Sequence, residues 1–270
     1  MTTPSSWKPR LVALDVDGTM LDPATQSISA GVRRAVSDVV EAGVHVVVST
    51  GRSMLGTLPV LDELGISDGD ALCSNGAVRV EVSSREAVSV ETFDPQPVYE
   101  RLSPLLPGAL YAAEQVGTAS LVTELFDPEE LHGPQRRCSV ERLLEHPVPR
   151  LIVNWAGHSP ERLRASMDGV VLPGCCYTVD HYQPWVTVVP DGVSKASALE
   201  KLRVELGVAA EDTLAVGDGD NDIQMLEWAH HGVAMGQGPS VVRSAADEVA
   251  GTVSEDGLVP VLRRWFPPRD

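Results

Sequence analysis

The chain of 270 residues has only four cysteines, and none of them belongs to a C-x-x-C pair. Two of them, Cys175 and Cys176, are adjacent and would be poor partners for each other. A disulfide framework or a cysteine-based metal site would need paired or regularly spaced cysteines. We therefore expect reduced thiols with a structural role.

Positive charge is also scarce. The sequence has 21 Lys and Arg against 38 Asp and Glu, which gives a formal net charge of −17. Nucleic-acid binding depends on neutralising phosphates with Lys and Arg, and anionic membranes attract basic segments in the same way. The charge balance argues against both partners. It leaves room for a small anionic substrate, because a metal ion or a lysine can reverse the potential at one site.

Long apolar runs are missing as well. No run approaches the roughly 18 apolar residues that a membrane-spanning helix needs. Residues 1–10 are polar, contain two prolines and lack the apolar core of a signal peptide. We therefore expect a cytoplasmic protein without membrane association, and no sequence feature calls for an obligate protein partner.

Short buried strands alternate with helices at both ends of the chain. The N-terminal part predicts strands at 11–14, 44–48 and 71–74, separated by helices at 29–42 and 53–64. Pro59 predicts a break or a late start in the second of these helices. The alternation resumes after Ser194 and continues to about Phe266. It predicts a parallel sheet with right-handed crossovers.

The middle third has a different texture, with alternating strand patterns, prolines and charges. Residues 78–82 and 87–92 predict a hairpin. We therefore expect the fold class α/β, with a doubly wound parallel sheet into which an α+β unit is inserted. The expected division is residues 1–82 and 186–270 for the sheet domain and residues 83–185 for the insertion.

Polar residues follow the predicted parallel strands where each strand ends. Asp15 and Asp17 follow the first strand, Thr50-Gly51 the second, Asn75-Gly76 the third and Asp218–Asp222 a C-terminal one. The carboxyl ends of parallel strands lie at one edge of the sheet, where open α/β sheets bind ligands. We therefore expect these residues to meet.

The two acidic stretches allow several kinds of chemistry. Asp15 and Asp17 could hold a cation, or one could attack a substrate while the other transfers protons; an ordinary Asp-Gly turn is the alternative. In Asp218–Asp222 the carboxylates repel one another unless a divalent cation, or simply solvent, compensates them. Neither stretch has the glycine and glutamate that a calcium EF-hand loop requires at its sixth and twelfth positions.

Two further stretches could bind an anion. Thr50 and the backbone after it could hold a phosphoryl oxygen, although Thr50 could equally be a helix cap. Lys195 stands at a predicted helix start, where a cation opposes the helix dipole. The helix therefore gives no structural reason for a lysine at this position, which favours a role in anion binding. An exposed lysine without such a role is the common alternative.

Four stretches taken in order resemble the motifs of the haloacid dehalogenase superfamily. They are Asp15-Val-Asp17-Gly-Thr, Ser49-Thr50-Gly-Arg52, Gly192-Val-Ser-Lys195 and Gly217-Asp218-Gly-Asp-Asn221-Asp222. The sequence is most similar to the Cof-type phosphatases, which carry a large α/β cap. Ala196 and Gly238-Pro239 depart from the usual pattern but change no catalytic side chain.

The resemblance implies a Rossmann-like core, a cap that reads the substrate, and hydrolysis of a small phosphorylated metabolite with Mg²⁺ as cofactor. Asp15 would be the nucleophile that forms an aspartyl-phosphate, and Asp17 the general acid and base. The implied phosphate-binding residues are Thr50, Gly51, Lys195 and Asn221. The implied metal ligands are Asp15, Asp17 through its backbone carbonyl, and Asp218, with Asp222 in support. Further candidates for substrate contacts are Arg52, Asn75, Gly76, Arg150 and His181.

Two alternatives remain open at this point. A phosphomutase or phosphotransferase would share the motifs and the cap but would pass the phosphoryl group to a sugar rather than to water. A non-catalytic phosphate- or metal-binding regulator would keep the fold with a decayed site. Against the second alternative, every expected functional group is present in the sequence.

Overall fold

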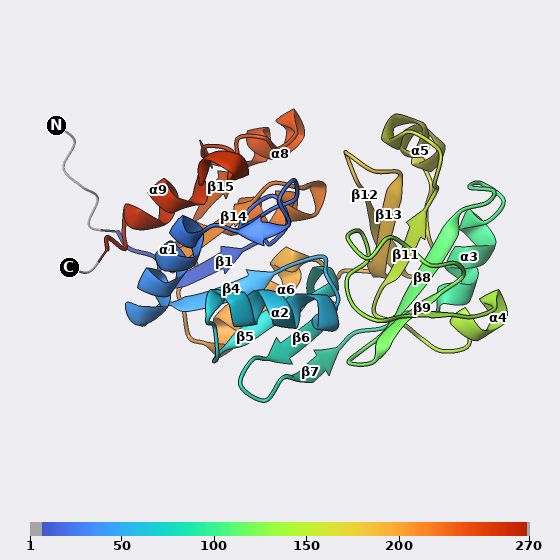
Figure 1. The fold of residues 1–270 in the computed structure, drawn as a ribbon, viewed down its shortest axis with the longest axis horizontal. Coiled ribbons are helices and arrows are strands. Elements are labelled where there is room, and N and C mark those ends of the chain that lie inside the picture. Colours follow the sequence, from blue (N-terminus) through green and yellow to red (C-terminus); the bar gives the residue numbers. More distant parts are fainter. Residues whose placement is uncertain (1–6, 269–270) are drawn as a thin grey trace.

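The computed structural model describes residues 7–268, which form two units side by side (Figure 1). Within these residues, one unit is built on an eight-stranded sheet in the order β16-β15-β14-β1-β4-β5-β6-β7. The other is built on a six-stranded sheet in the order β10-β9-β8-β11-β13-β12. No helix in the described part of the chain is long and apolar enough to cross a membrane.

The elements of the first unit come from both ends of the chain. Its sheet contains β1 (Leu11–Leu14), β4 (His45–Ser49), β5 (Asp70–Cys73), β6 (Val78–Glu81), β7 (Glu86–Val90), β14 (Thr213–Gly217), β15 (His231–Ala234) and β16 (Glu248–Val249). A small pair, β2 (Leu21–Asp22) and β3 (Ser27–Ile28), follows β1. The helices are α1 (Ala30–Glu41), α2 (Met54–Leu64), α6 (Lys195–Glu205), α7 (Ile223–Trp228), α8 (Ser240–Ala245) and α9 (Leu258–Arg263). Short 3₁₀ turns are η1 (Ser74–Gly76), η2 (Ala210–Asp212), η3 (Asp220–Asp222) and η4 (Val253–Glu255).

Six neighbouring strands of this sheet, β16 through β5, pair in parallel, as the alternating sequence pattern predicts. β1 lies between β14 and β4, with Leu14 opposite both Val216 and Val48. The three strand ends are therefore level with one another. The expected α/β fold class, a doubly wound parallel core with an inserted unit, is confirmed.

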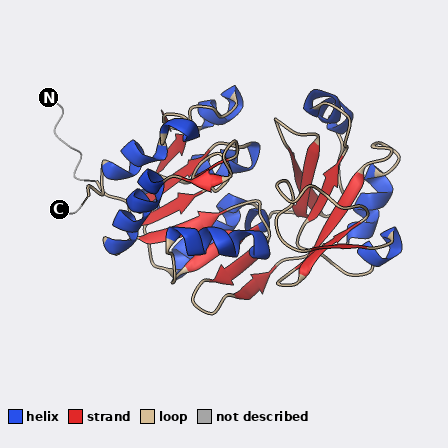
Figure 2. Ribbon diagram, in the orientation of Figure 1, coloured by secondary structure: helices blue, strands red, loops and turns tan. Residues whose placement is uncertain are grey.

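Helices cover both faces of the parallel sheet because its strands are apolar on both sides (Figure 2). Val12 and Leu14 of β1 pack in a cluster with α1, α2 and α9. Leu11 and Ala13 face the other way and pack in a cluster with α6, α7 and α8. The core strand β1 is thus fully buried, and it holds the residue that follows it in a fixed place.

The second unit has one helix-covered face. Its strands are β8 (Leu110–Gln115), β9 (Ala119–Val122), β10 (Gln135–Arg137), β11 (Leu151–Asn154), β12 (Cys175–Val179) and β13 (Trp185–Pro190). Its helices are α3 (Pro95–Leu102), α4 (Val140–Leu143) and α5 (Pro160–Met167). All three helices pack against the same apolar face, which includes Tyr111, Leu151 and Val186. They lie on the side turned away from the first unit (Figure 1).

The sheets divide the chain at different residues from the predicted boundaries. β7 lies after residue 83 but pairs with β6 in the eight-stranded sheet. β13 extends past residue 185 but pairs with β11 and β12 in the six-stranded sheet. The alternation of apolar and polar residues predicts that a segment is a strand, but it does not predict which strand the segment pairs with. This explains both differences. The assignment of functions to the two parts remains a proposal.

Pro59 does not break α2, so that prediction was wrong. The helix runs continuously from Met54 to Leu64 with the proline inside it. Ser53 caps its start by accepting a hydrogen bond from the amide of Gly56. A proline in a helix interior costs about 3 kcal/mol. The burial of the apolar face of α2 against the sheet offsets that cost.

Candidate active site

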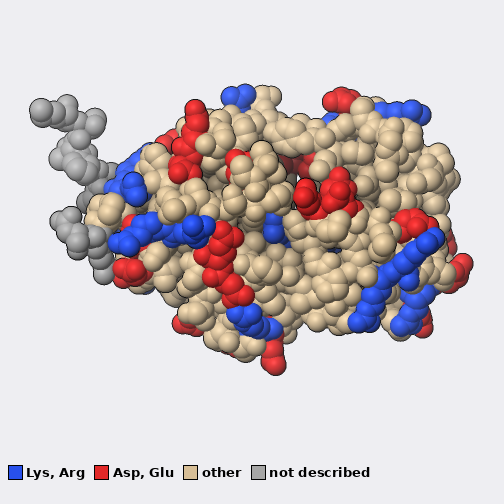
Figure 3. All heavy atoms as spheres, viewed as in Figure 1, with Lys and Arg blue, Asp and Glu red and all other residues tan. Residues whose placement is uncertain are grey.

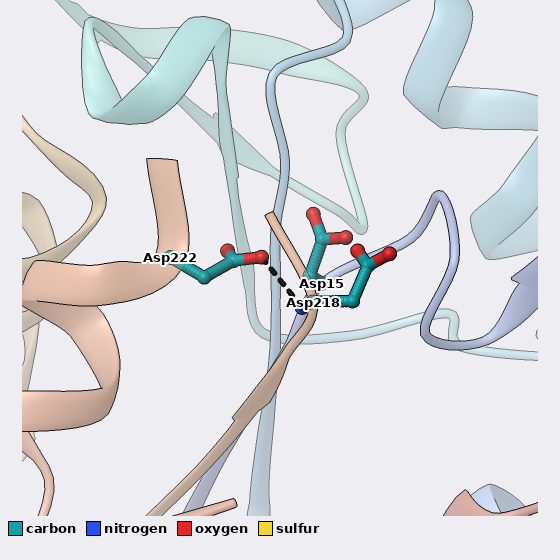
Figure 4. Close-up of side chains that lie close together, drawn as sticks. All are labelled: Asp15, Asp218 and Asp222. Carbon is teal, nitrogen blue, oxygen red and sulfur yellow. Dashed lines mark hydrogen bonds between the residues drawn. The ribbon is translucent and has the colours of Figure 1, made fainter. Parts of the chain in front are cut away.

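Three carboxylates meet at the carboxyl edge of the parallel sheet. Asp15 follows β1 directly, Asp218 follows the neighbouring β14, and Asp222 ends η3. Each offers an oxygen within 4.8 Å of the others, and all three residues are buried. Figure 4 shows the carboxylates of Asp15 and Asp218 side by side, with Asp222 approaching from the start of the next helix.

Lys195 lies between two of these carboxylates. Its Nζ donates to Oδ1 of Asp15 and to Oδ1 of Asp222, both at 2.6 Å. The lysine side chain is fully buried at the start of α6. Burial alone would lower its pKa, but the carboxylates of Asp15 and Asp222 outweigh burial and raise the pKa of Lys195. The ammonium is therefore charged and fixed.

Asp222 shapes the loop that carries Asp218. Its Oδ2 accepts hydrogen bonds from the backbone amides of Asp218 and Gly219, both at 2.9 Å. Gly217 permits this closeness, because a Cβ there would lie 2.4 Å from Cγ of Asp222. Since both oxygens of Asp222 are engaged, this carboxylate is better placed to orient the site than to bind a ligand directly.

The site carries more negative charge than Lys195 neutralises. Burial, and then the charge of Asp222, raises the pKa of Asp15. The same two causes raise the pKa of Asp218 to about 7. A divalent cation bound by hard carboxylate oxygens would relieve this repulsion. The donor set of Asp15 and Asp218, with Asp222 behind them, fits Mg²⁺.

Asp17 lies at the edge of the cluster and pairs with Arg52. Arg52 donates from Nε to Oδ2 at 2.8 Å and from Nη2 to Oδ1 at 2.5 Å. The Asp17 side chain is 44% exposed, whereas that of Arg52 is only 9% exposed. Gly18, which directly follows Asp17, has φ +79°, and a Cβ there would lie 2.1 Å from Oδ2 of Asp218. The turn after Asp15 therefore requires glycine.

The loops after β4 and β5 converge beside the carboxylates. Thr50 is fully buried, and its Oγ1 accepts a hydrogen bond from the amide of Arg52 at 3.1 Å. Asn75 accepts a hydrogen bond from Nδ2 of Asn221 at 2.9 Å. A Cβ at Gly51 would lie 3.2 Å from the Asn75 side chain and 3.4 Å from that of Asn221. The structure thus brings the predicted phosphate-binding residues and Asn75 together.

Gly76 has a packing role in this arrangement. Its φ is +95°, and a Cβ there would lie 2.6 Å from the carbonyl oxygen of Ser194. Glycine therefore lets η1 approach the start of the helix that carries Lys195. Its predicted contact with substrate remains a prediction.

Two residues of the second unit that were predicted to contact substrate reach the first unit. Arg150 donates from Nη1 to the carbonyl of Gly51 and lies beside Glu114. His181 contacts Oδ2 of Asp220, which lies between Asp218 and Asp222 in the sequence. The second unit therefore contacts the loops on two sides of the carboxylate cluster.

Sequence reasoning missed two residues of this environment. Gln237 donates from Nε2 to the carbonyl of Gly18 at 2.5 Å and to Oδ2 of Asp218 at 3.1 Å. It lies just beyond the end of β15, where a polar residue could have been suspected. Glu114 is buried on β8, where it follows Tyr111, Ala112 and Ala113. An isolated acid in such a strand was the available signal.

The sequence matches a family model described as haloacid dehalogenase-like hydrolase over residues 12–105 and 169–262. The matched stretches include Asp15, Thr50, Lys195 and Asp218. The unmatched stretch between them holds most of the six-stranded sheet. The similarity to this family is therefore strongest in the unit that carries the carboxylate cluster.

Curated relatives align over nearly the whole chain. The 5-amino-6-(5-phospho-D-ribitylamino)uracil phosphatase YitU of Bacillus subtilis (strain 168) is 25% identical, covering 96% of this chain and 98% of its own. The pyridoxal phosphate phosphatase YbhA of Escherichia coli (strain K12) is 26% identical, covering 94% and 97%. Both relatives are phosphatases.

Solved structures of haloacid dehalogenase-like hydrolases and phosphatases also superpose on nearly the whole chain. A haloacid dehalogenase-like hydrolase from Bacillus subtilis superposes with a TM-score of 0.80 at 25% identity, covering 94% of this chain and 99% of its own. BT1666 from Bacteroides thetaiotaomicron, described among phosphatases of the haloalkanoate (HAD) superfamily, superposes with a TM-score of 0.78 at 26% identity, covering 98% of each chain. The likeness extends over both units.

Proposed function

The chain belongs to the haloacid dehalogenase-like hydrolases, as a Cof-type phosphatase, and from that premise we propose a Mg²⁺-dependent enzyme that hydrolyses a small phosphorylated metabolite through an aspartyl-phosphate. A sugar phosphate or a similar monoester is the substrate class we propose. The cytoplasm is the compartment we propose for it.

One observation carries the proposal: a buried lysine, Lys195, binds the carboxylate of Asp15, which directly follows the central strand β1. Lys195 orients Asp15 and opposes the rise in its pKa at the edge where ligands bind in this fold. A charged, oriented carboxylate is a nucleophile suited to attack on phosphorus. Asp17 lies on the next turn, exposed enough to reach a leaving group.

In the first step, an oxygen of Asp15 would form a bond to phosphorus while the bond from phosphorus to the ester oxygen breaks. Asp17 would give its proton to that oxygen, so that the product leaves as an alcohol. In the second step, Asp17 would take a proton from water as the water oxygen attacks phosphorus. The bond to Asp15 breaks and inorganic phosphate leaves. Asp15 is then a carboxylate again, and Asp17 again carries its proton.

Donors around the phosphoryl group would stabilise the charge that builds up in both transition states. We assign this to the hydroxyl of Thr50, the backbone at Gly51, the ammonium of Lys195 and the amide of Asn221. One donor of this kind contributes roughly 2.7–4 kcal/mol to catalysis. Arg52, which holds both oxygens of Asp17, would orient the acid and base.

For the metal, we assign Asp15, Asp218 and the backbone carbonyl of Asp17 as ligands, with Asp222 supporting them. Its bonds to the amides of Asp218 and Gly219 fix the loop that presents Asp218. Bound Mg²⁺ would offset the negative charge of the phosphate and of the attacking carboxylate.

The six-stranded unit is the part to which we assign the choice of leaving group. YitU and YbhA are named for quite different phosphorylated compounds, a ribitylaminouracil phosphate and pyridoxal phosphate.

A nucleic-acid substrate is disfavoured by the net charge of −17. On the face shown in Figure 3, Lys and Arg are interspersed with Asp and Glu.

A panel of phosphate monoesters tests this function. We expect the purified protein to release phosphate from p-nitrophenyl phosphate and from at least one sugar phosphate in the presence of Mg²⁺. Chelation of the metal should stop the release, and readdition should restore it. A protein that releases no phosphate from any ester, or that transfers the phosphoryl group to a sugar without releasing it, would contradict the proposal.

A further inference from the structure

Two oppositely charged side chains are buried where the six-stranded unit meets the loops of the active site. Glu114 lies on β8, and Arg150 immediately precedes the neighbouring strand β11. Each residue is only 5% exposed. Arg150 Nε lies 3.3 Å from Oε2 of Glu114, and the amide of Glu114 donates to the carbonyl of Arg150 at 3.1 Å.

Both side chains direct their hydrogen bonds at the first unit. Arg150 donates from Nη1 to the carbonyl of Gly51. Glu114 accepts from the amide of Met54 at 3.3 Å through Oε1 and from the hydroxyl of Ser74 through Oε2. One ion pair therefore contacts the loop after β4 and the loop after β5.

The four residues to which we assign phosphate binding, Thr50, Gly51, Lys195 and Asn221, are called the phosphate grip. The loop after β4 carries Thr50 and Gly51, and the loop after β5 contacts Asn221 through Asn75. Ser74 and Asn75 have φ values of 52° and 55°, which are unfavourable for residues other than glycine and need support from their surroundings. The amide of Asn75 donates to the carbonyl of Thr50 at 3.0 Å, and its side chain binds Asn221. The contacts of Glu114 thus extend through Asn75 to the grip.

A gain in stability does not explain why Glu114 and Arg150 are buried as an ion pair. Removing two charges from water is costly, and an apolar pair of similar volume is often as stable or more stable. Burial lowers the pKa of Arg150, and the charge of Glu114 opposes that shift. By contrast, the ion pair of Arg137 with Glu124 in the same unit is exposed and joins two residues of that unit.

We infer that Glu114 and Arg150 are positioning residues, which align the loops at Gly51 and Asn75 for phosphoryl binding only while the six-stranded unit is docked on them. The inference rests on the proposed function, because it assigns a purpose to the same site. It means that correct docking of the substrate-reading unit and formation of the phosphate grip occur together.

Two variants separate this role from a structural one: Arg150→Met alone, and Arg150→Met combined with Glu114→Gln. In the first, the carboxylate of Glu114 stays buried without its partner, so we expect a lower midpoint of denaturant unfolding and a loss in kcat/KM on the order of 10²-fold. The combined variant leaves no buried charge and should regain most of the stability. It should not regain activity, because Gly51 loses the Arg150 donor and a glutamine at position 114 presents one acceptor oxygen where Glu114 uses two, to Met54 and Ser74.

Binding of orthovanadate, an analogue of the transferring phosphoryl group, is measured by calorimetry with Mg²⁺ present and needs no turnover. We expect the combined variant to bind it on the order of tenfold or more weakly than the wild type. Arg137→Met, at an exposed pair of the same unit, should change neither binding nor kcat/KM.

Recovery of both stability and orthovanadate binding in the combined variant would show a purely structural pair and overturn the inference. Unchanged binding in Arg150→Met would overturn it as well. Failure of the wild type to hydrolyse any ester would count against the proposed function separately, because the binding comparison does not depend on turnover.

Discussion

Lys195 is the residue on which the charge arrangement of the site depends. A cation at a helix N-terminus is opposed by the helix dipole, and a buried ammonium is costly. The two bonds of 2.6 Å to Asp15 and Asp222 compensate both effects. The capping box at Ser194 secures the helix start without help from the lysine. The position therefore serves the carboxylates rather than the helix.

Replacing Lys195 with Met should harm stability and catalysis together. Two buried carboxylates would lose their partner, and we expect the free energy of unfolding to fall by about 3–5 kcal/mol without metal. We expect kcat to fall by about 10²–10³-fold with Mg²⁺. Chemical denaturation and steady-state kinetics measure the two effects.

Lys201→Met provides the matched control, because Lys201 lies on the same helix and forms an exposed pair with Glu91. That variant should resemble the wild type in both measurements. If Lys195→Met behaved like Lys201→Met, the assigned role of Lys195 would be wrong.

At the scale of elements, the C-terminal helix α9 is held to the sheet through Glu248. Arg264, which follows α9, donates two hydrogen bonds to this carboxylate at 2.6 and 2.7 Å. His231 at the start of β15 lies 3.0 Å from it. The hydrogen bonds from Arg264, and to a smaller extent the one with His231, lower the pKa of Glu248 to about 2. The edge strand β16 has only two residues, so this pairing supplements a short ladder.

Glu248→Gln should lower the free energy of unfolding by about 1 kcal/mol at pH 7. The folded pKa of Glu248 lies below its ordinary value of 4.5, so its contribution is present above pH 4.5 and is lost as the pH falls toward 2. The gap between variant and wild type should therefore close over that range. Denaturant unfolding at several pH values measures it.

Glu227→Gln, at an exposed position on α7, is the comparison for this series and should show no such pH-dependent gap. A gap for Glu248→Gln that stays constant from pH 7 to pH 3 would exclude the ion pair as its cause.

At the scale of the whole molecule, the sequence predicts the core better than the contacts between units. Asp15, Thr50 and Asp218 each follow a parallel strand, and the geometry of such a sheet places those ends together. The pairing of Asp17 with Arg52 depends on side-chain conformations that no periodicity encodes. The contact of Arg150 with Gly51 spans two sheets and 99 residues of sequence, and it depends on how the units dock.

The central claim is that Asp15 becomes phosphorylated, and an Asp17→Asn variant tests it most directly. p-Nitrophenolate leaves without a proton, so the first step should still occur with p-nitrophenyl phosphate and Mg²⁺. Activation of water for the second step should be lost. Mass spectrometry of the acid-quenched variant should then find one phosphoryl group on the peptide that contains Asp15. An active wild type, together with an Asp17→Asn variant that releases p-nitrophenol and never carries that group, would contradict the account.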